Sequence, residues 1–138
     1  MKRFVVDASV VLAWFLDRPV PDYAQRIAEI LRAGGQAVVP PLWHLEVANG
    51  LVVAERRRLI ARNDVDQSLI YLESLLALAI ETSGYAVSLR QAMTAGRTFH
   101  LSAYDATYLE TARYEKLPLA TLDQPLRTAA TRAHVELL

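Results

Sequence analysis

Short apolar segments alternate with longer helical patterns along most of this chain, and that alternation restricts the fold. The apolar segments resemble strands buried on both faces of a parallel sheet, and they cover residues 4–6, 36–39, 79–82, 119–121 and 135–137. Helical patterns cover residues 8–16, 22–32, 42–58, 64–78, 85–95, 102–115 and 124–132. Strands alternating with helices predict an α/β fold, a three-layer α/β/α sandwich around a short, mostly parallel sheet of four to five strands.

The length and composition predict one compact domain over residues 1–138. A chain of 138 residues fits the usual domain size, and 53% hydrophobic residues against 22% charged residues argue against disorder. Cysteine is absent, so a disulfide framework and a thiolate metal site are both excluded. Any metal site must therefore rely mainly on oxygen ligands.

The charge balance and the apolar pattern limit the possible partners. Fifteen basic and fifteen acidic residues give a formal charge of zero, which disfavours partners that depend on overall electropositivity. The first apolar run ends at Asp7, and Asp17 and Arg18 interrupt the next one. No stretch approaches the roughly 18 apolar residues of a membrane span or the core of a signal peptide, so we expect a cytoplasmic protein with no membrane segment.

Four acidic residues lie where the expected elements change. Asp7 directly follows the expected strand at 4–6, and Asp123 follows the expected strand at 119–121 after one intervening residue. Asp105 falls in the first turn of the helix after Ser102, and Glu46 lies near the start of the helix after residues 36–39. In a parallel sheet the carboxyl ends of the strands share one edge, and ligands bind at the point of that edge where the order of the strands reverses. We therefore expect these four carboxylates to lie near one another at that edge.

Each acid also has an ordinary structural explanation. Asp7 and Asp123 are suitable helix N-caps, and Ser102-x-x-Asp105 resembles a capping box. Glu46 is harder to explain in this way, because its helix is apolar almost all round and an unpaired buried carboxylate is costly. Carboxylates that meet in one pocket repel one another and take up protons unless a divalent cation holds them ionised. The four acids together therefore indicate a metal site.

Four short segments resemble the motifs of PIN domains. They occur in the family's order and spacing, at residues 5–9 (VVDAS), 45–49 (LEVAN), 101–106 (LSAYDA) and 120–126 (ATLDQPL). The resemblance extends over the whole chain, although residues 63–96 carry no matching motif. The short form of the chain is most similar to VapC toxins of toxin–antitoxin pairs.

The resemblance implies a PIN-fold endoribonuclease that depends on Mg²⁺ or Mn²⁺, is inhibited by a cognate antitoxin and forms a homodimer. It implies Asp7, Glu46, Asp105 and Asp123 as the catalytic and metal-binding residues. Asp7 and Asp105 are the first choices as ligands, with the other two binding directly or through water. Hard cations prefer carboxylate oxygens and lower the pKa of bound water, which agrees with this chemistry.

Neighbouring polar residues are candidates for supporting roles. Ser9, Asn49 and Thr121 each lie two or three residues from an acid, where they would orient ligands or waters or, equally well, serve as caps and core polar groups. Arg97, expected in a loop over residues 96–100, is the best-placed phosphate contact for RNA. The basic run at 56–58 is more simply a solvated helix end than an RNA site. His44, His100 and His134 are scattered and form no metal pattern.

Two other functions require residues that this sequence lacks at the necessary positions. A phosphohydrolase with Asp7 as nucleophile would need a second Asp where Ser9 stands. A phosphoryl-accepting receiver domain would need a Lys near the last strand, whereas Lys116 precedes residues 119–121. A stand-alone PIN nuclease and a non-catalytic PIN scaffold remain alternatives. A homodimer is also expected from the helices at 42–54 and 69–78, which carry more apolar residues than one packed face requires.

Overall fold

The computed structural model describes residues 2–138 and contains an all-parallel sheet. Within those residues the sheet has four strands in the order β3-β2-β1-β4, comprising β1 (Arg3–Val6), β2 (Gln36–Val39), β3 (Ile80–Thr82) and β4 (Leu119–Ala120). Strand β1 pairs with β2 on one side and with β4 on the other, with Val5 opposite both Val38 and Leu119. The predicted parallel α/β sheet is confirmed.

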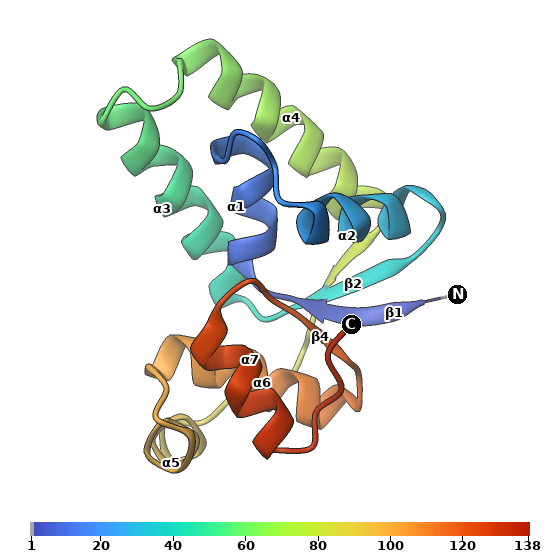
Figure 1. Cartoon of the computed structure of the whole chain (residues 1–138), viewed down its shortest axis with the longest axis vertical. Coiled ribbons are helices and arrows are strands. Elements are labelled where there is room, and N and C mark those ends of the chain that lie inside the picture. The colour runs from blue at the N-terminus through green and yellow to red at the C-terminus, as the bar shows by residue number, and fades with distance from the viewer. Residues whose placement is uncertain (1) are drawn as a thin grey trace.

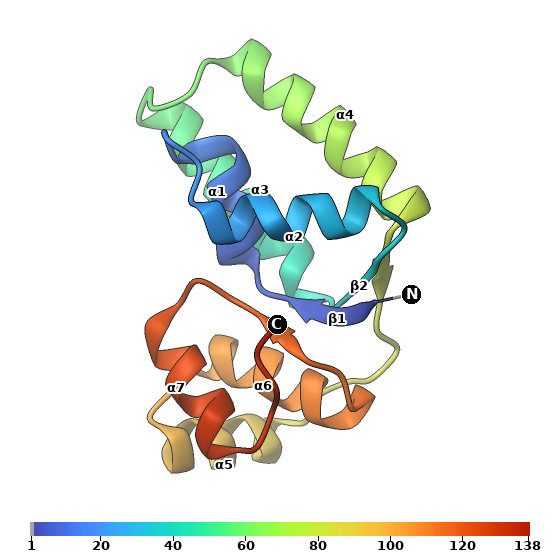
Figure 2. The ribbon, with the colours of Figure 1, turned by 45° about the vertical axis from the view of Figure 1, so that its right-hand side comes forward.

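Helices cover both faces of this sheet (Figures 1 and 2). One layer contains α1 (Ala8–Leu16), α2 (Asp22–Arg32), α3 (Leu42–Arg56) and α4 (Arg62–Leu78). The opposite layer contains α5 (Leu89–Phe99), α6 (Ala103–Glu115) and α7 (Gln124–Arg132). The predicted three-layer sandwich is therefore confirmed.

The central position of β1 explains its sequence. Phe4, Val5 and Val6 are fully buried because helices cover both faces of the strand, so the strand has no polar alternation. Helix α2 shows the opposite pattern, since it covers the sheet with one face only. It buries Ala24, Ile27, Ala28 and Leu31, while most of its other residues stay in contact with solvent.

The strand order reverses between β1 and β4. From β1 the chain moves outward through β2 to β3, with the connecting helices α1 to α4 on one face. It then crosses to the other face through α5 and α6 and returns as β4 on the free side of β1. Connections that leave neighbouring strands toward opposite faces open a crevice at their carboxyl ends, and such a crevice is the usual ligand site of open parallel sheets.

The prediction for residues 85–100 is wrong in its boundaries. The sequence pattern predicts a helix at 85–95 and a loop at 96–100, whereas α5 runs from Leu89 to Phe99. Ser88 starts the helix, because its hydroxyl accepts from the Gln91 N–H while the Gln91 side chain accepts from the Ser88 N–H. Gly96 therefore lies inside the helix, close to the Leu101 carbonyl that follows in the turn.

The final predicted strand is reduced to a single bridge. Residues 135–137 contribute only the parallel pairing of Leu137 with Leu119. Strand β4 is two residues long, so Leu119 alone exchanges hydrogen bonds with this segment, through Glu136 and Leu138. Other predicted boundaries differ slightly, since α3 ends at Arg56 and α4 begins at Arg62.

In residues 2–138, none of the helices combines the length and the apolar character that a membrane crossing requires.

Candidate functional site

Asp7 lies at the carboxyl end of β1 and is 4% exposed. It occupies the N-cap position of α1, yet its side chain makes no capping hydrogen bond to that helix. The hydroxyls of Ser9 and Thr121 instead both donate to its Oδ2 atom, at 2.8 and 2.7 Å. The capping explanation therefore does not account for the Asp7 carboxylate.

Ser9 and Thr121 join the end of β1 to the end of β4. Besides donating to Asp7, the Ser9 hydroxyl accepts from the Leu122 N–H, and the Thr121 hydroxyl accepts from the Asp123 N–H. The backbone N–H of Asp7 also donates to the Ala120 carbonyl at 2.9 Å. These bonds fix the Asp7 carboxylate at the edge where the strand order reverses. Both hydroxyls donate to the same carboxylate oxygen. The supporting positions predicted for Ser9 and Thr121 agree with this geometry.

Asp123 combines two roles. Its Oδ2 atom accepts from the Leu126 N–H at 3.0 Å, so the carboxylate does cap α7, as its ordinary explanation requires. Its charge also raises the pKa of both Asp7 and Asp105. A capping carboxylate thus lies close enough to the other acids to affect their ionisation.

Glu46 receives a hydrogen bond that the sequence analysis did not anticipate. The hydroxyl of Tyr108, a fully buried residue of α6, donates to Glu46 Oε1 at 2.6 Å. Burial raises the Glu46 pKa, the Tyr108 hydrogen bond opposes that effect, and the Asp7 charge adds to it. Tyr108 lies three positions after Asp105 and so shares its helix face, which was the signal available in the sequence.

The pKa of Asp105 is affected by all three of the other acids. It lies in the first turn of α6, where Ser102 caps the helix by accepting from the Asp105 N–H. Burial raises the Asp105 pKa to about 6, and the charges of Asp123, Asp7 and Glu46 all contribute in the same direction. The charge of Asp105 thus interacts with the charges of the other three predicted acids at the carboxyl edge of the sheet.

The donor set suits a hard divalent cation that keeps some of its water ligands. Burial and the neighbouring carboxylates raise the pKa values of Asp7, Glu46 and Asp105, and hydrogen bonds from hydroxyl groups oppose that effect. Across residues 2–138, no three potential ligand side chains converge tightly enough to form a complete metal site unaided. Mg²⁺ usually binds through one or two carboxylates plus waters, so the arrangement fits such a cation.

The remaining predicted residues lie outside this network. Asn49 is exposed on α3, and no hydrogen bond of its side chain is found within the described residues. His44 forms a hydrogen bond with the hydroxyl of Thr82, the last residue of β3, at 2.8 Å rather than with an acid.

Arg97 is not in a loop. It lies in the last turn of α5 and is exposed, so the reason for placing it beside Asp105 is removed. The basic run at 56–58 is exposed at the end of α3, as a solvated helix end would be.

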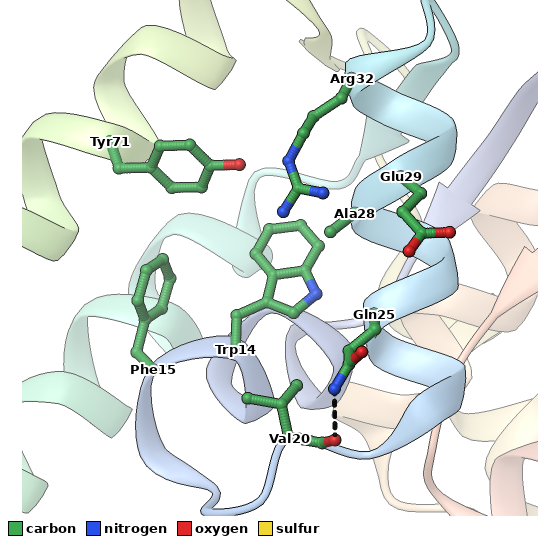
Figure 3. Close-up of a pocket in the computed structure, with 8 residues that line it drawn as sticks. All are labelled: Trp14, Phe15, Val20, Gln25, Ala28, Glu29, Arg32 and Tyr71. Carbon is green, nitrogen blue, oxygen red and sulfur yellow. Dashed lines mark hydrogen bonds between the residues drawn. The ribbon is translucent and has the colours of Figure 1, made fainter.

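A separate pocket of about 400 Å³ lies between α1, α2 and α4 (Figure 3). Trp14 and Phe15 form much of its apolar lining, Tyr71 faces them from α4, and Arg32 reaches in from α2. None of the four acids lines this pocket. The carboxylate cluster, and not the pocket, is therefore the candidate site for chemistry.

Comparisons with solved structures give the same fold at low sequence identity. The crystal structure of PAE2754 from Pyrobaculum aerophilum is similar over 93% of this chain and 84% of that chain, with 20% identity and a TM-score of 0.70. FitAcB from Neisseria gonorrhoeae matches 98% of this chain and 96% of that chain, with 19% identity and a TM-score of 0.68. A toxin–antitoxin complex from Klebsiella pneumoniae matches 87% and 86%, with 19% identity and a TM-score of 0.57.

A comparison with curated proteins gives no match. The family model of the PIN domain, in contrast, matches residues 4–131, which include all four acids of the cluster. PIN domains are typically nucleases that use divalent metals. The chain belongs to the PIN-domain family.

Proposed function

We propose that this chain is a Mg²⁺- or Mn²⁺-dependent endoribonuclease whose catalytic residues are Asp7, Glu46, Asp105 and Asp123. The observation that carries the proposal is Asp7. This buried carboxylate lies where the strand order reverses, two hydroxyls donate to one of its oxygens, and its charge interacts with those of Asp123, Glu46 and Asp105. Membership of a nuclease family and the oxygen-only donor set support the same reading.

The four acids differ in their exposure to solvent. Asp7 is buried and oriented, whereas Glu46, Asp105 and Asp123 are only partly buried and remain in contact with solvent. A divalent cation held at the cluster would supply the positive charge that a phosphodiester needs for attack at phosphorus. The orienting bonds to Asp7 and Glu46 fix where those carboxylates present their oxygens.

We expect the purified protein to cleave RNA in Mg²⁺ or Mn²⁺ and to lose that activity in EDTA, because the repelling carboxylates need a cation to act together. Gel analysis of a labelled RNA, with the metal withheld, chelated and then restored, measures this. The Asp7→Asn protein purified in the same way controls for contaminating ribonucleases. Cleavage at the full rate in chelator would remove the metal from the mechanism.

We propose further that the nuclease is the toxin of a toxin–antitoxin pair, most similar to VapC, and that a cognate antitoxin restrains it. This finer assignment is supported by the motif resemblance and by the likeness to a protein solved within a toxin–antitoxin complex. A stand-alone PIN nuclease and a non-catalytic PIN scaffold are the alternatives. An RNA contact at Arg97 stays a prediction. Placement in a loop no longer supports it, because Arg97 lies in α5.

Expression of the chain without a partner should arrest bacterial growth, and Asp105→Ala should relieve the arrest. The expected cause is RNA cleavage at the acid cluster. Growth curves with matched protein levels, verified by immunoblot, measure the effect. Normal growth with abundant wild-type protein would contradict the toxin assignment and leave the nuclease assignment intact.

We also propose a homodimer. Large apolar side chains are exposed on α3 (Leu45 and Val52) and on α4 (Leu69, Ile70 and Leu78), more than a solvated helix face requires. Burying one of these surfaces against a second copy would remove that apolar area from water. Light scattering should therefore give twice the chain mass at micromolar concentration, and a mass of 15.4 kDa would contradict the proposal.

A further inference from the structure

Tyr108 is fully buried, and its hydroxyl bonds directly to an acid of the cluster that belongs to the opposite layer of helices. It belongs to α6, below the sheet in Figure 1, and its hydroxyl donates to Glu46 on α3, above the sheet. The two residues are 62 positions apart in the chain. The bond therefore links the two helix layers at the edge where the acids lie.

The geometry makes the Tyr108 hydroxyl the donor of this bond. The ring has no exposed surface, and its hydroxyl lies 2.6 Å from Glu46 Oε1. A phenolic hydroxyl has one hydrogen to donate, and an ionised carboxylate oxygen can only accept it. A residue needed only for packing would not need this hydroxyl.

We propose that Tyr108 is a positioning residue that fixes one oxygen of Glu46 and so orients the other oxygen for the cation. This inference rests on the proposed metal-dependent function. Asp105 and Tyr108 share one face of α6, so the same helix contributes one carboxylate to the cluster and orients another. Residues that support metal ligands in this way typically affect metal affinity by about 10–100-fold.

The test is Tyr108→Phe, which removes a single oxygen from a fully buried ring. Mn²⁺ affinity, measured by calorimetry on the metal-free protein, should fall by about tenfold, with kcat/KM for RNA cleavage falling in parallel. The matched control is Tyr104→Phe, the same change one turn earlier on α6 at a residue 62% exposed. The control should leave the Mn²⁺ affinity within about twofold of wild type.

A double-mutant cycle separates positioning from packing. If Tyr108 acts through Glu46, adding Tyr108→Phe to Glu46→Gln should lower Mn²⁺ affinity little beyond Glu46→Gln alone. Equal affinity in Tyr108→Phe and wild type would overturn the inference and leave the proposed function standing. A full additional loss in the Glu46→Gln background, together with a lower melting temperature, would also overturn it. A wild-type protein that binds no Mn²⁺ would overturn the proposed function and this inference with it.

Discussion

Replacing Asp7 by Asn should lower the rate of RNA cleavage by more than about a hundredfold while the protein stays folded, since even residues that only support a metal ligand cost up to about that much when lost. The substituted amide has nearly the same shape as the carboxylate, and its carbonyl oxygen can accept from Ser9 and Thr121 in place of Oδ2. It removes a charge that burial and Asp123 both disfavour. The melting temperature of the metal-free protein should therefore hold or rise.

Single-turnover cleavage assays and thermal unfolding, performed on the same preparations, measure the two effects. Asp17→Asn is the matched control, because Asp17 is exposed at the far end of the same helix. The control should change neither quantity appreciably. If Asp7→Asn lowers the melting temperature together with activity, the carboxylate stabilises the fold and its assignment to the metal is contradicted.

The metal-free protein should become more stable as the pH falls from 7 toward 5, the reverse of the usual behaviour of an acidic group. Burial raises the Asp105 pKa from its ordinary value of 3.8 to about 6, so the folded state binds this proton more tightly than the unfolded chain does. The resulting stabilisation is full below the unfolded value and is lost as the pH rises through about 6. Asp7 and Glu46, with pKa values raised in the same direction, add to the trend.

Asp105→Asn should raise the melting temperature of the metal-free protein at pH 7.5 and flatten its dependence on pH. In the wild type at limiting metal, activity should fall below pH 6 by up to about tenfold per pH unit, because protons compete with the cation for the carboxylates. A higher Mg²⁺ concentration should restore part of the activity at pH 5.5. A melting temperature of metal-free protein that falls steadily from pH 7 to pH 5 would contradict the raised pKa values.

The sequence predicted much of the fold because local signals and tertiary packing agree in most elements. Helices α1, α2 and α7 have the predicted boundaries, since Asp7, Pro21 and Asp123 mark where each one starts. The error in the boundaries of α5 arose because the local sequence signal and the tertiary packing differ there. Gly96 normally interrupts a helix, but here a side chain would crowd the Leu101 carbonyl, and His100 then ends the helix with a positive φ of 56°.

The proximity of the four acids was predictable, because each one lies just after a strand or in a helix that begins at the carboxyl edge of the sheet, and the chain order determines that edge. Their catalytic and metal-binding roles stay predictions. Their hydrogen-bond partners were harder to predict. A bond between α3 and α6 depends on how the two helix layers are positioned relative to each other across the sheet. Tyr108 was missed for this reason, even though its spacing from Asp105 was visible. Asn49 is exposed rather than close to the network, since spacing from Glu46 does not determine which helix face points to solvent.

The hydroxyls that hold Asp7 come from widely separated parts of the chain. Ser9 is two residues away, whereas Thr121 is 114 residues away. During synthesis, the ribosome delivers Ser9 first and Thr121 only 112 residues later. A nascent chain that has not yet reached β4 therefore contains the first helices without an assembled carboxylate cluster, which forms only when β4 has paired with β1. If the cluster is the proposed nuclease site, the strand order delays any cleavage until β4 has been synthesised and paired.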